Sequence, residues 1–192
     1  MSKIKLGFFG GSFNPPINTH TNIANKLIKD KILDNVIFVP VGDYYSKKNL
    51  IAANHRYNML KILCKENKNF RVENIASSST KMLYAIDTFR LIYEKYHNVA
   101  DIYFIMGSDN FKKISTWNDH YELLDKYNFI VVSRGEQQDI PITDNVFYYK
   151  NIEDDITSTC IRKKIAQNED VSKYISPSVI KYIKENKLYG IA

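Results

Sequence analysis

Short hydrophobic runs alternate with amphipathic stretches along most of the 192-residue chain. Runs such as IKLGFFG (4–10) and NVIFVPV (35–41) are typical of buried strands. The stretches between them repeat apolar residues at helical spacing, so that Ile23, Leu27 and Ile28 share one face of the segment 19–32. The expected strands are 4–10, 35–41, 70–76, 101–107 and 128–135, and the expected helices between them are 19–32, 53–66, 85–96 and 120–127.

This alternation predicts the α/β fold class, as a Rossmann-like, doubly wound parallel sheet with helices on both faces. Ligands of such sheets bind beyond the carboxyl ends of the strands. Four of the expected strands end on turn residues, at 10–11, Pro40, Gly107 and 134–135. We therefore expect the binding site at that edge of the sheet.

From Thr157 onward the pattern becomes helical, over 158–170 and again over 176–189. We expect a single domain, with a Rossmann-like core over residues 1–156 and a C-terminal helical part over 157–192. The helical part is expected to be a small appendage that closes over one edge of the sheet.

The composition and charge indicate which partners and which cellular compartment to expect. The net charge is +6, but the lysines are spread along the chain, which favours anionic small molecules over nucleic acid as partners. Cys64 and Cys160 match no metal-binding spacing and are expected to be free thiols in a reducing compartment. No apolar run reaches membrane-spanning length and the N-terminal run is too short for a signal peptide, so we expect a cytoplasmic protein.

The segment GGSFNPPINTH (10–20) has the character of a phosphate-binding loop. Gly10 and Gly11 let the backbone approach an anion and adopt left-handed angles. The helix after Pro15 and Pro16 would direct its N-terminal amides at the same anion. The spacing matches neither the P-loop nor the dinucleotide fingerprint, and a tight strand-to-helix turn explains the glycines equally well.

Two further features bear on anion binding. His20 lies in the first turn of the expected helix, where an imidazolium can face phosphate oxygens, although a lone histidine is more often a polar surface residue. In ITSTCIR (156–162), Ser158 or Thr159 can cap a helix and Arg162 projects from the same helix end. These three residues form either an anion clamp or an ordinary helix cap beside a solvated arginine.

The pairing of GGSFNPPINTH with TSTCIR resembles the nucleotidyltransferase superfamily, and more closely its bacterial nicotinate-nucleotide adenylyltransferases. Other segments that match, in the right order over nearly the whole chain, are HRYNML (55–60), YAIDT (84–88), FIMGSDNF (104–111), Trp117, VVSRG (131–135) and VIKYIKENKLY (179–189).

The resemblance implies that an adenylyl group passes from ATP, whose phosphates carry Mg²⁺, to the phosphate of nicotinate mononucleotide. The products are nicotinate adenine dinucleotide and pyrophosphate, in NAD biosynthesis. It implies two small-molecule substrates, no protein-bound metal, and no nucleic-acid or membrane partner. A homo-oligomer is compatible with the resemblance. The implied catalytic residues are His20 and Arg162. The implied ATP-binding residues are Gly10, Gly11, Ser12, Phe13, His20, Lys47, Lys48, Gly107, Asp109, Ser158, Thr159 and Arg162. The implied mononucleotide-binding residues are Tyr84, Ala85, Trp117 and Arg134.

The chain departs from the family pattern at three positions. Ile17 stands where the loop has its first histidine, Thr19 replaces a small residue, and Ala85 replaces a threonine. Loss of one preorganised donor typically lowers turnover by ~10²–10³. We therefore expect a slow adenylyltransferase, in which Ile17→His raises turnover if position 17 points at the phosphates. The alternatives are a relative with another acceptor or donor base, such as pantetheine phosphate or a cytidylyl donor, and a non-catalytic nucleotide-binding protein.

Overall fold

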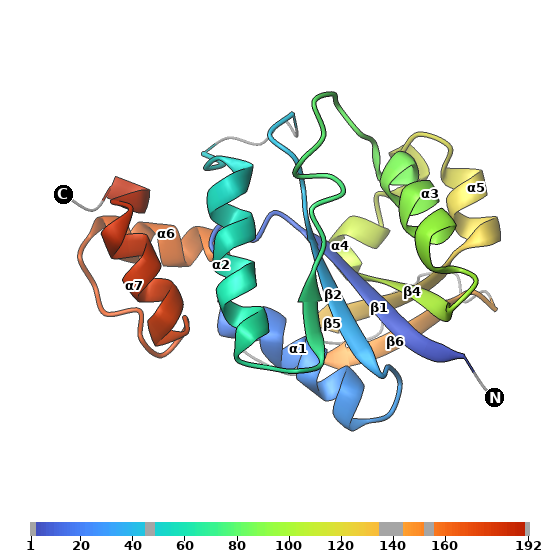
Figure 1. Cartoon of the computed structure of the whole chain (residues 1–192), viewed down its shortest axis with the longest axis horizontal. Coiled ribbons are helices and arrows are strands. Elements are labelled where there is room, and N and C mark those ends of the chain that lie inside the picture. The colour runs from blue at the N-terminus through green and yellow to red at the C-terminus, as the bar shows by residue number, and fades with distance from the viewer. Residues whose placement is uncertain (1–2, 45–48, 135–143, 152–155, 191–192) are drawn as a thin grey trace.

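One parallel sheet forms the centre of the molecule. The computed structural model describes residues 3–44, 49–134, 144–151 and 156–190. Within these residues the sheet has six strands in the order β3-β2-β1-β4-β5-β6, and every neighbouring pair is parallel (Figure 1). The strands are β1 (Ile4–Gly11), β2 (Asn35–Pro40), β3 (Phe70–Val72), β4 (Ala100–Gly107), β5 (Asn128–Arg134) and β6 (Val146–Asn151). The expected fold class is confirmed.

The two edge strands differ from expectation. The third strand is three residues long instead of seven, because the chain turns at Asn74, whose carbonyl accepts the N–H of Ser78 at 2.8 Å. The sequence pattern did not predict β6. This strand lies at the edge of the sheet and alternates a buried Val146 with an exposed Phe147, so it lacks the continuous apolar run of the central strands.

Helices connect the strands close to the expected ranges. They are α1 (Asn18–Lys29), α2 (Ala53–Lys65), α3 (Ala85–Tyr96), α4 (Ser108–Phe111), α5 (His120–Lys126), α6 (Ser158–Ala166) and α7 (Pro177–Glu185), with 3₁₀ turns η1 (Ile114–Thr116) and η2 (Leu188–Gly190). The first helix ends earlier than expected because Lys31 takes a left-handed backbone conformation, with φ of 59°.

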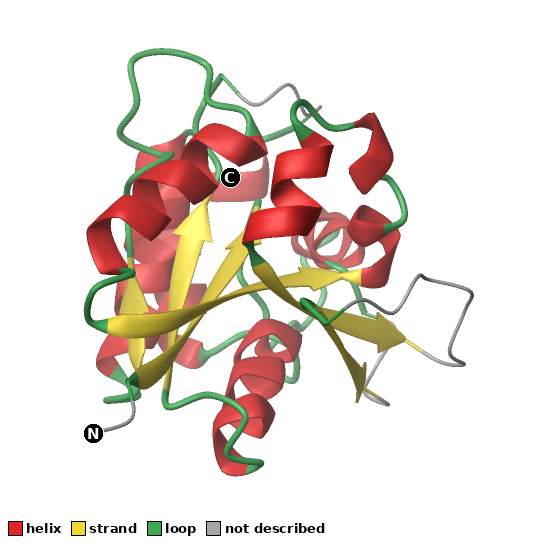
Figure 2. Cartoon of the chain, turned by 90° about the vertical axis from the view of Figure 1, so that its right-hand side faces the viewer, coloured by secondary structure: helices red, strands yellow, loops and turns green. Residues whose placement is uncertain are grey.

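Helices cover both faces of the sheet (Figure 2). One apolar cluster joins the strands to α3 and α5 through Ile86, Ile92 and Leu123. A second cluster, on the other face, joins them to α1 and α2 and includes Leu27 and Leu60. This two-sided burial explains why the central strands are apolar throughout.

The C-terminal helices form the expected appendage, and α6 reaches the carboxyl edge of the sheet through the loop after β1, where Ser158 and Arg162 donate to the carbonyls of Pro15 and Asn14. In Figure 1, α6 and α7 lie beside α2, away from the strands. They share a third apolar cluster with the start of α1 and with α2, in which Ile17, Met59 and Leu63 contact residues such as Ile161 and Ile183. This cluster contains no strand residue, because the apolar faces of α6 and α7 are buried against a helix. The domain boundary at residue 156 remains a prediction.

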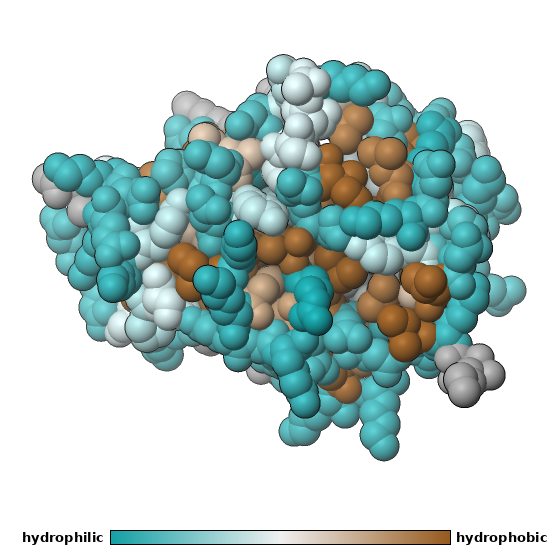
Figure 3. Space-filling view, in the orientation of Figure 1, coloured by the Kyte–Doolittle hydropathy of each residue, from teal (hydrophilic) through white to brown (hydrophobic). Residues whose placement is uncertain are grey.

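The surface mixes hydrophilic and hydrophobic areas. On the face in Figure 3, α6 and α7 are mostly hydrophilic, whereas hydrophobic side chains are visible over the sheet and beside α3. Exposed large apolar side chains include Ile4, Met82 and Tyr84. Among the described residues, no helix combines the length and apolar character that a membrane span requires.

Candidate active site at the carboxyl edge of the sheet

Four strands end at the same edge, as expected, at Gly11, Pro40, Gly107 and Arg134. Gly10 and Gly107 are exposed there, and a Cβ built on either glycine meets no described atom within 4 Å. Their lack of a side chain therefore leaves open space at the edge, where a ligand can approach the backbone.

The glycines do not take left-handed backbone angles, so that part of the expectation was wrong. The left-handed residue of the loop is Phe13, with φ of 45°. Its ring is 2% exposed and packs edge-on against Phe9, Phe38 and His20. Because the ring is part of the core, only the backbone of Phe13 is available to lie against a nucleotide.

His20 lies in the first turn of α1, as expected. The backbone N–H of Ile17, the residue that precedes α1, donates to Nδ1 of His20 at 3.0 Å. The His20 side chain thereby caps the N-terminus of α1. Since Nδ1 accepts a hydrogen bond, the proton of the neutral ring lies on Nε2. The fold thus sets both the tautomer and the orientation of this imidazole.

Ile17 is buried in an apolar cluster and is not exposed at the carboxyl edge of the sheet. Its side chain is 3% exposed and belongs to the apolar cluster of α2, α6 and α7. The condition under which Ile17→His would raise turnover is therefore not met in this structure. The first amide of α1 is also engaged, because the N–H of Asn18 donates to the carbonyl of Tyr174 at 2.8 Å. The helix N-terminus therefore offers fewer amides to an anion than expected.

The structure brings the glycine-rich loop and the TSTCIR segment together. Arg162 donates from Nη1 to the carbonyl of Asn14 at 2.7 Å and from Nη2 to Oγ1 of Thr159 at 3.2 Å. The Ser158 hydroxyl donates to the carbonyl of Pro15 at 2.8 Å. The cap of α6 is Thr157, whose Oγ1 accepts the N–H of Cys160, and not Ser158 or Thr159 as expected. Ser158 and Thr159 are instead the first helical residues, with their side chains beside the loop and Arg162.

Asn14, which no sequence pattern marked as functional, joins three segments at this point. The residue is 1% exposed. Its Nδ2 donates to the carbonyl of Asn49 at 2.7 Å, and its Oδ1 accepts the hydroxyl of Tyr189 at 3.0 Å. Burial raises the pKa of Tyr189, so its hydroxyl keeps its proton and remains a donor. A buried asparagine in a proline-rich loop was the only available signal, and its partners lie too far along the chain to be foreseen.

The residues expected to bind the mononucleotide lie around α3 and α5. Tyr84 is exposed and precedes α3, with its N–H bonded to Oδ2 of Asp87 at 2.9 Å, and Ala85 is the first helical residue. Trp117 follows η1 and is half-buried against the core. Arg90 links the two helices by donating to Asp119 at 3.0 Å.

The remaining expected residues are only partly accounted for. Asp109 is exposed in α4, two residues after Gly107. Lys47, Lys48 and the side chain of Arg134 lie outside the described residues. In the described part of the chain, no group of three or more histidine, cysteine or acidic side chains is placed to hold a metal ion.

Comparison with known proteins places this site in a family. A sequence profile described as cytidylyltransferase-like matches residues 8–164, which covers both the glycine-rich loop and the TSTCIR segment. The chain belongs to this family. Within the family it belongs with the nicotinate-nucleotide adenylyltransferases. It is 32% identical to a probable nicotinate-nucleotide adenylyltransferase of Fusobacterium nucleatum, over 95% of this chain and 98% of that one. It is 30% identical to the nicotinate-nucleotide adenylyltransferase of Bacillus subtilis, over 96% and 98% of the two chains.

A solved structure with a similar fold is the nicotinic acid mononucleotide adenylyltransferase of Plasmodium falciparum complexed with NaAD. Its TM-score is 0.82, with 22% identity over 98% of each chain. The similarity extends through the C-terminal helices as well as the sheet. The chain is therefore a nucleotidyltransferase with a Rossmann-like α/β fold.

Proposed function

We propose that this protein transfers the adenylyl group of ATP to nicotinate mononucleotide, forming nicotinate adenine dinucleotide and pyrophosphate. The observation that carries the proposal is the contact between the glycine-rich loop and the N-terminus of α6, through Arg162 and Ser158. Membership of the nicotinate-nucleotide adenylyltransferases supports the choice of donor and acceptor.

The reaction needs alignment and charge stabilisation more than it needs a protein nucleophile. An oxygen of the mononucleotide phosphate attacks the α-phosphorus of ATP, a new P–O bond forms, and the bond to the leaving pyrophosphate breaks. The attacking phosphate is already ionised at neutral pH, so no general base is required to generate it. Catalysis then depends on holding two anionic substrates together and stabilising the charge that develops on the leaving group.

The chain supplies donors for both tasks. In this proposal, the backbone at Gly10, Ser12 and Phe13 lies against ATP, and Nε2 of His20 donates to its phosphates. Arg162 is already fixed by Asn14 and Thr159, so its guanidinium is oriented before ATP binds, and it lies with Ser158 and Thr159 against the β- and γ-phosphates. Gly107 at the end of β4 and Asp109 in α4 are assigned to the adenosine part of ATP. Lys47 and Lys48 are assigned to the phosphates of ATP.

The mononucleotide is assigned to the region of α3 and α5. The first N–H groups of a helix have no partner within it, so those at the start of α3, where Tyr84 and Ala85 lie, suit a carboxylate on the pyridine ring. Trp117 provides an aromatic face for that ring, and Arg134 is assigned to the mononucleotide phosphate. If backbone amides hold the carboxylate, Ala85 in place of threonine is compatible with this acceptor.

Mg²⁺ enters in this proposal as part of the MgATP substrate. A cation of this kind is held mainly by phosphate oxygens and water. When bound, Mg²⁺ neutralises phosphate charge and helps the pyrophosphate to leave. The proposed location is the cytoplasm, where the ATP substrate is available.

An assay of pyrophosphate release tests the proposal and separates it from its two rivals. The purified protein is given ATP or CTP with nicotinate mononucleotide, nicotinamide mononucleotide or pantetheine phosphate. The proposal predicts release with ATP and nicotinate mononucleotide above all other pairs. Preference for another pair would favour a relative with a different acceptor or base. ATP binding without release from any pair would favour a non-catalytic nucleotide-binding protein.

A further inference from the structure

Arg56 is a buried charged residue for which the proposed reaction has no direct use. It lies in the first turn of α2, and its side chain is 0% exposed. Burial lowers the pKa of Arg56, which shows that removing the guanidinium from water opposes its charge. A buried guanidinium is tolerated only when its N–H groups are satisfied, so its partners indicate its role.

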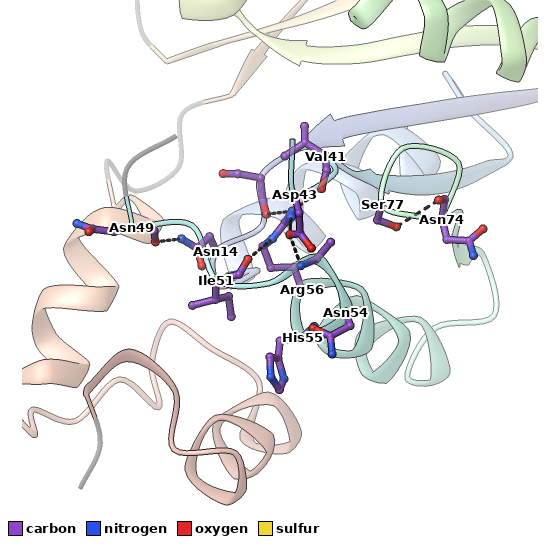
Figure 4. A network of polar contacts seen from close by, with 12 residues as sticks. Asn14, Val41, Asp43, Asn49, Ile51, Asn54, His55, Arg56, Asn74 and Ser77 are labelled. Atoms are coloured by element: carbon purple, nitrogen blue, oxygen red, sulfur yellow. Dashed lines mark hydrogen bonds and ion pairs between the residues drawn. The ribbon is translucent and has the colours of Figure 1, made fainter. Parts of the chain in front are cut away.

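Its partners are main-chain carbonyls from three separate segments (Figure 4). Nε donates to the carbonyl of Ile51 at 2.8 Å. Nη1 donates to the carbonyl of Val41 at 2.7 Å and to that of Ser12 at 3.2 Å. One guanidinium thus joins the glycine-rich loop, the residue after β2 and the residues before α2.

A side-chain partner completes the set. Nη2 of Arg56 lies 3.4 Å from Oδ1 of Asp43, which also accepts the N–H of Ala53 at 2.6 Å. Asp43 is mostly exposed, so water partly screens its attraction to Arg56. The carbonyls are therefore the contacts through which Arg56 affects the fold.

The contact with Ser12 orients the next amide of the loop. A trans peptide unit is planar, with its N–H pointing opposite to its C=O. Because the carbonyl of Ser12 points at Arg56, the N–H of Phe13 points away from the buried guanidinium. The carbonyl of Gly11 is held in a similar way by the N–H of Val41, at 3.0 Å. The peptide planes of Gly11–Ser12 and Ser12–Phe13 are thus both fixed through their carbonyl groups.

We propose that Arg56 is a positioning residue for adenylyl transfer, which fixes the peptide planes of Gly11–Phe13 so that their amide side faces the phosphates of ATP. The inference rests on the proposed function, and Arg56 itself contacts no substrate. Lysine cannot replace Arg56. The three carbonyls lie in different directions, which suits the several N–H donors of a planar guanidinium and not a single ammonium group.

The test compares Arg56→Lys with a control, Arg71→Lys. Arg71 is exposed on β3 and also donates to main-chain carbonyls, those of Lys68 and Phe70, but it does not contact the loop. At a temperature where all proteins are folded, Arg56→Lys should lower kcat on the order of 10- to 10²-fold, because misplacement of a phosphate-binding group has effects of this size. The KM for the mononucleotide should be unchanged, and Arg71→Lys should retain wild-type kcat.

Hydrogen exchange gives a readout that does not depend on turnover. In Arg56→Lys, exchange should become faster in peptides that cover Gly10–Pro16, and MgATP should slow it less than in the wild type. Soluble guanidinium added to Arg56→Gly should restore part of the lost kcat. If Arg56→Lys does not fold, Arg56→Gln, which carries no buried charge, takes its place in the same measurements.

The outcomes separate this inference from the proposed function. A folded Arg56 variant with wild-type kcat and wild-type loop exchange would overturn the positioning role. A wild-type protein that transfers no adenylyl group would overturn the proposed function, and loop exchange would still decide whether Arg56 orders the loop.

Discussion

At the scale of single residues, His20 is the side chain whose chemistry the fold controls most directly. Its Nδ1 accepts the N–H of Ile17, so its remaining proton is on Nε2. The proposed function uses that proton to stabilise phosphate charge, and it requires no imidazole at position 17.

Replacing His20 by asparagine separates its two roles. The Oδ1 of asparagine can take the place of Nδ1 and keep the bond to the backbone of Ile17, whereas the Nε2–H donor is lost. We expect His20→Asn to keep its thermal stability and its ATP affinity close to wild type and to lose about 10²-fold in kcat. Steady-state kinetics and calorimetry measure these quantities. A kcat within threefold of wild type would remove His20 from the catalytic residues.

Ile17→His is expected to destabilise the protein and not to activate it. The side chain at position 17 is packed among apolar residues of α2, α6 and α7, where an imidazole has no designed partner. Burying a polar group in this way costs about 1–3 kcal/mol, which denaturant unfolding can detect. The matched control, Ile17→Val, should lose only about 0.5–1.5 kcal/mol. A stable Ile17→His variant with raised kcat would show that this position does reach the phosphates.

Between elements, the contact that matters most is the one between the C-terminal turn and the glycine-rich loop. The Tyr189 hydroxyl donates to Oδ1 of the buried Asn14. Tyr189→Phe should lower the free energy of unfolding by about 1–3 kcal/mol, because it leaves a buried acceptor unsatisfied, and it should also lower kcat. Tyr182→Phe is the matched control, since that hydroxyl bonds His55 and Asn58 on α2 and does not contact the loop. Equal kcat in the two variants would mean that Tyr189 acts on stability alone.

The N-terminus of α6 carries a natural probe in Cys160. Hydrogen bonds from Thr157 lower the pKa of this exposed thiol, whereas burial raises the pKa of Cys64 to about 12. A lower pKa means more thiolate at neutral pH, so iodoacetamide should label Cys160 first, as followed by mass spectrometry. MgATP should slow that labelling, because the neighbouring Ser158 and Thr159 are proposed to bind phosphates. Labelling that MgATP does not affect would place the phosphates elsewhere.

Most helices and strands could be predicted from the sequence, but the way in which they pack against one another could not. The helix over residues 85–96 was predicted to the residue because its apolar spacing is regular. Strand β6 was missed because, at the edge of the sheet, exposed residues such as Phe147 and Lys150 interrupt its buried ones. The packing of α6 and α7 against α2 could not be foreseen, because an apolar helix face does not reveal whether it will pack on a sheet or on another helix.

For the whole molecule, the sequence predicted that the glycine-rich loop and the TSTCIR segment would meet, as they do in the structure, but not the groups that hold the loop in place. Gly10, His20 and Arg162 were proposed from the sequence because their residue types suit phosphate, and their role stays a prediction. Arg56 and Asn14 were not, since their partners are backbone carbonyls far away in the sequence. Such contacts leave no periodic signal, and a sheet that brings distant loops to one edge creates them only on folding.

The central claim is that this whole arrangement performs adenylyl transfer with a single loop imidazole. The most direct test is to incubate the wild-type protein with MgATP labelled at its α-phosphate and with nicotinate mononucleotide, and to separate the products by chromatography. The account predicts that the label appears in nicotinate adenine dinucleotide, in an amount equal to the pyrophosphate released, and only when the mononucleotide is present. Tight binding of labelled ATP with no labelled dinucleotide, even after prolonged incubation, would contradict it.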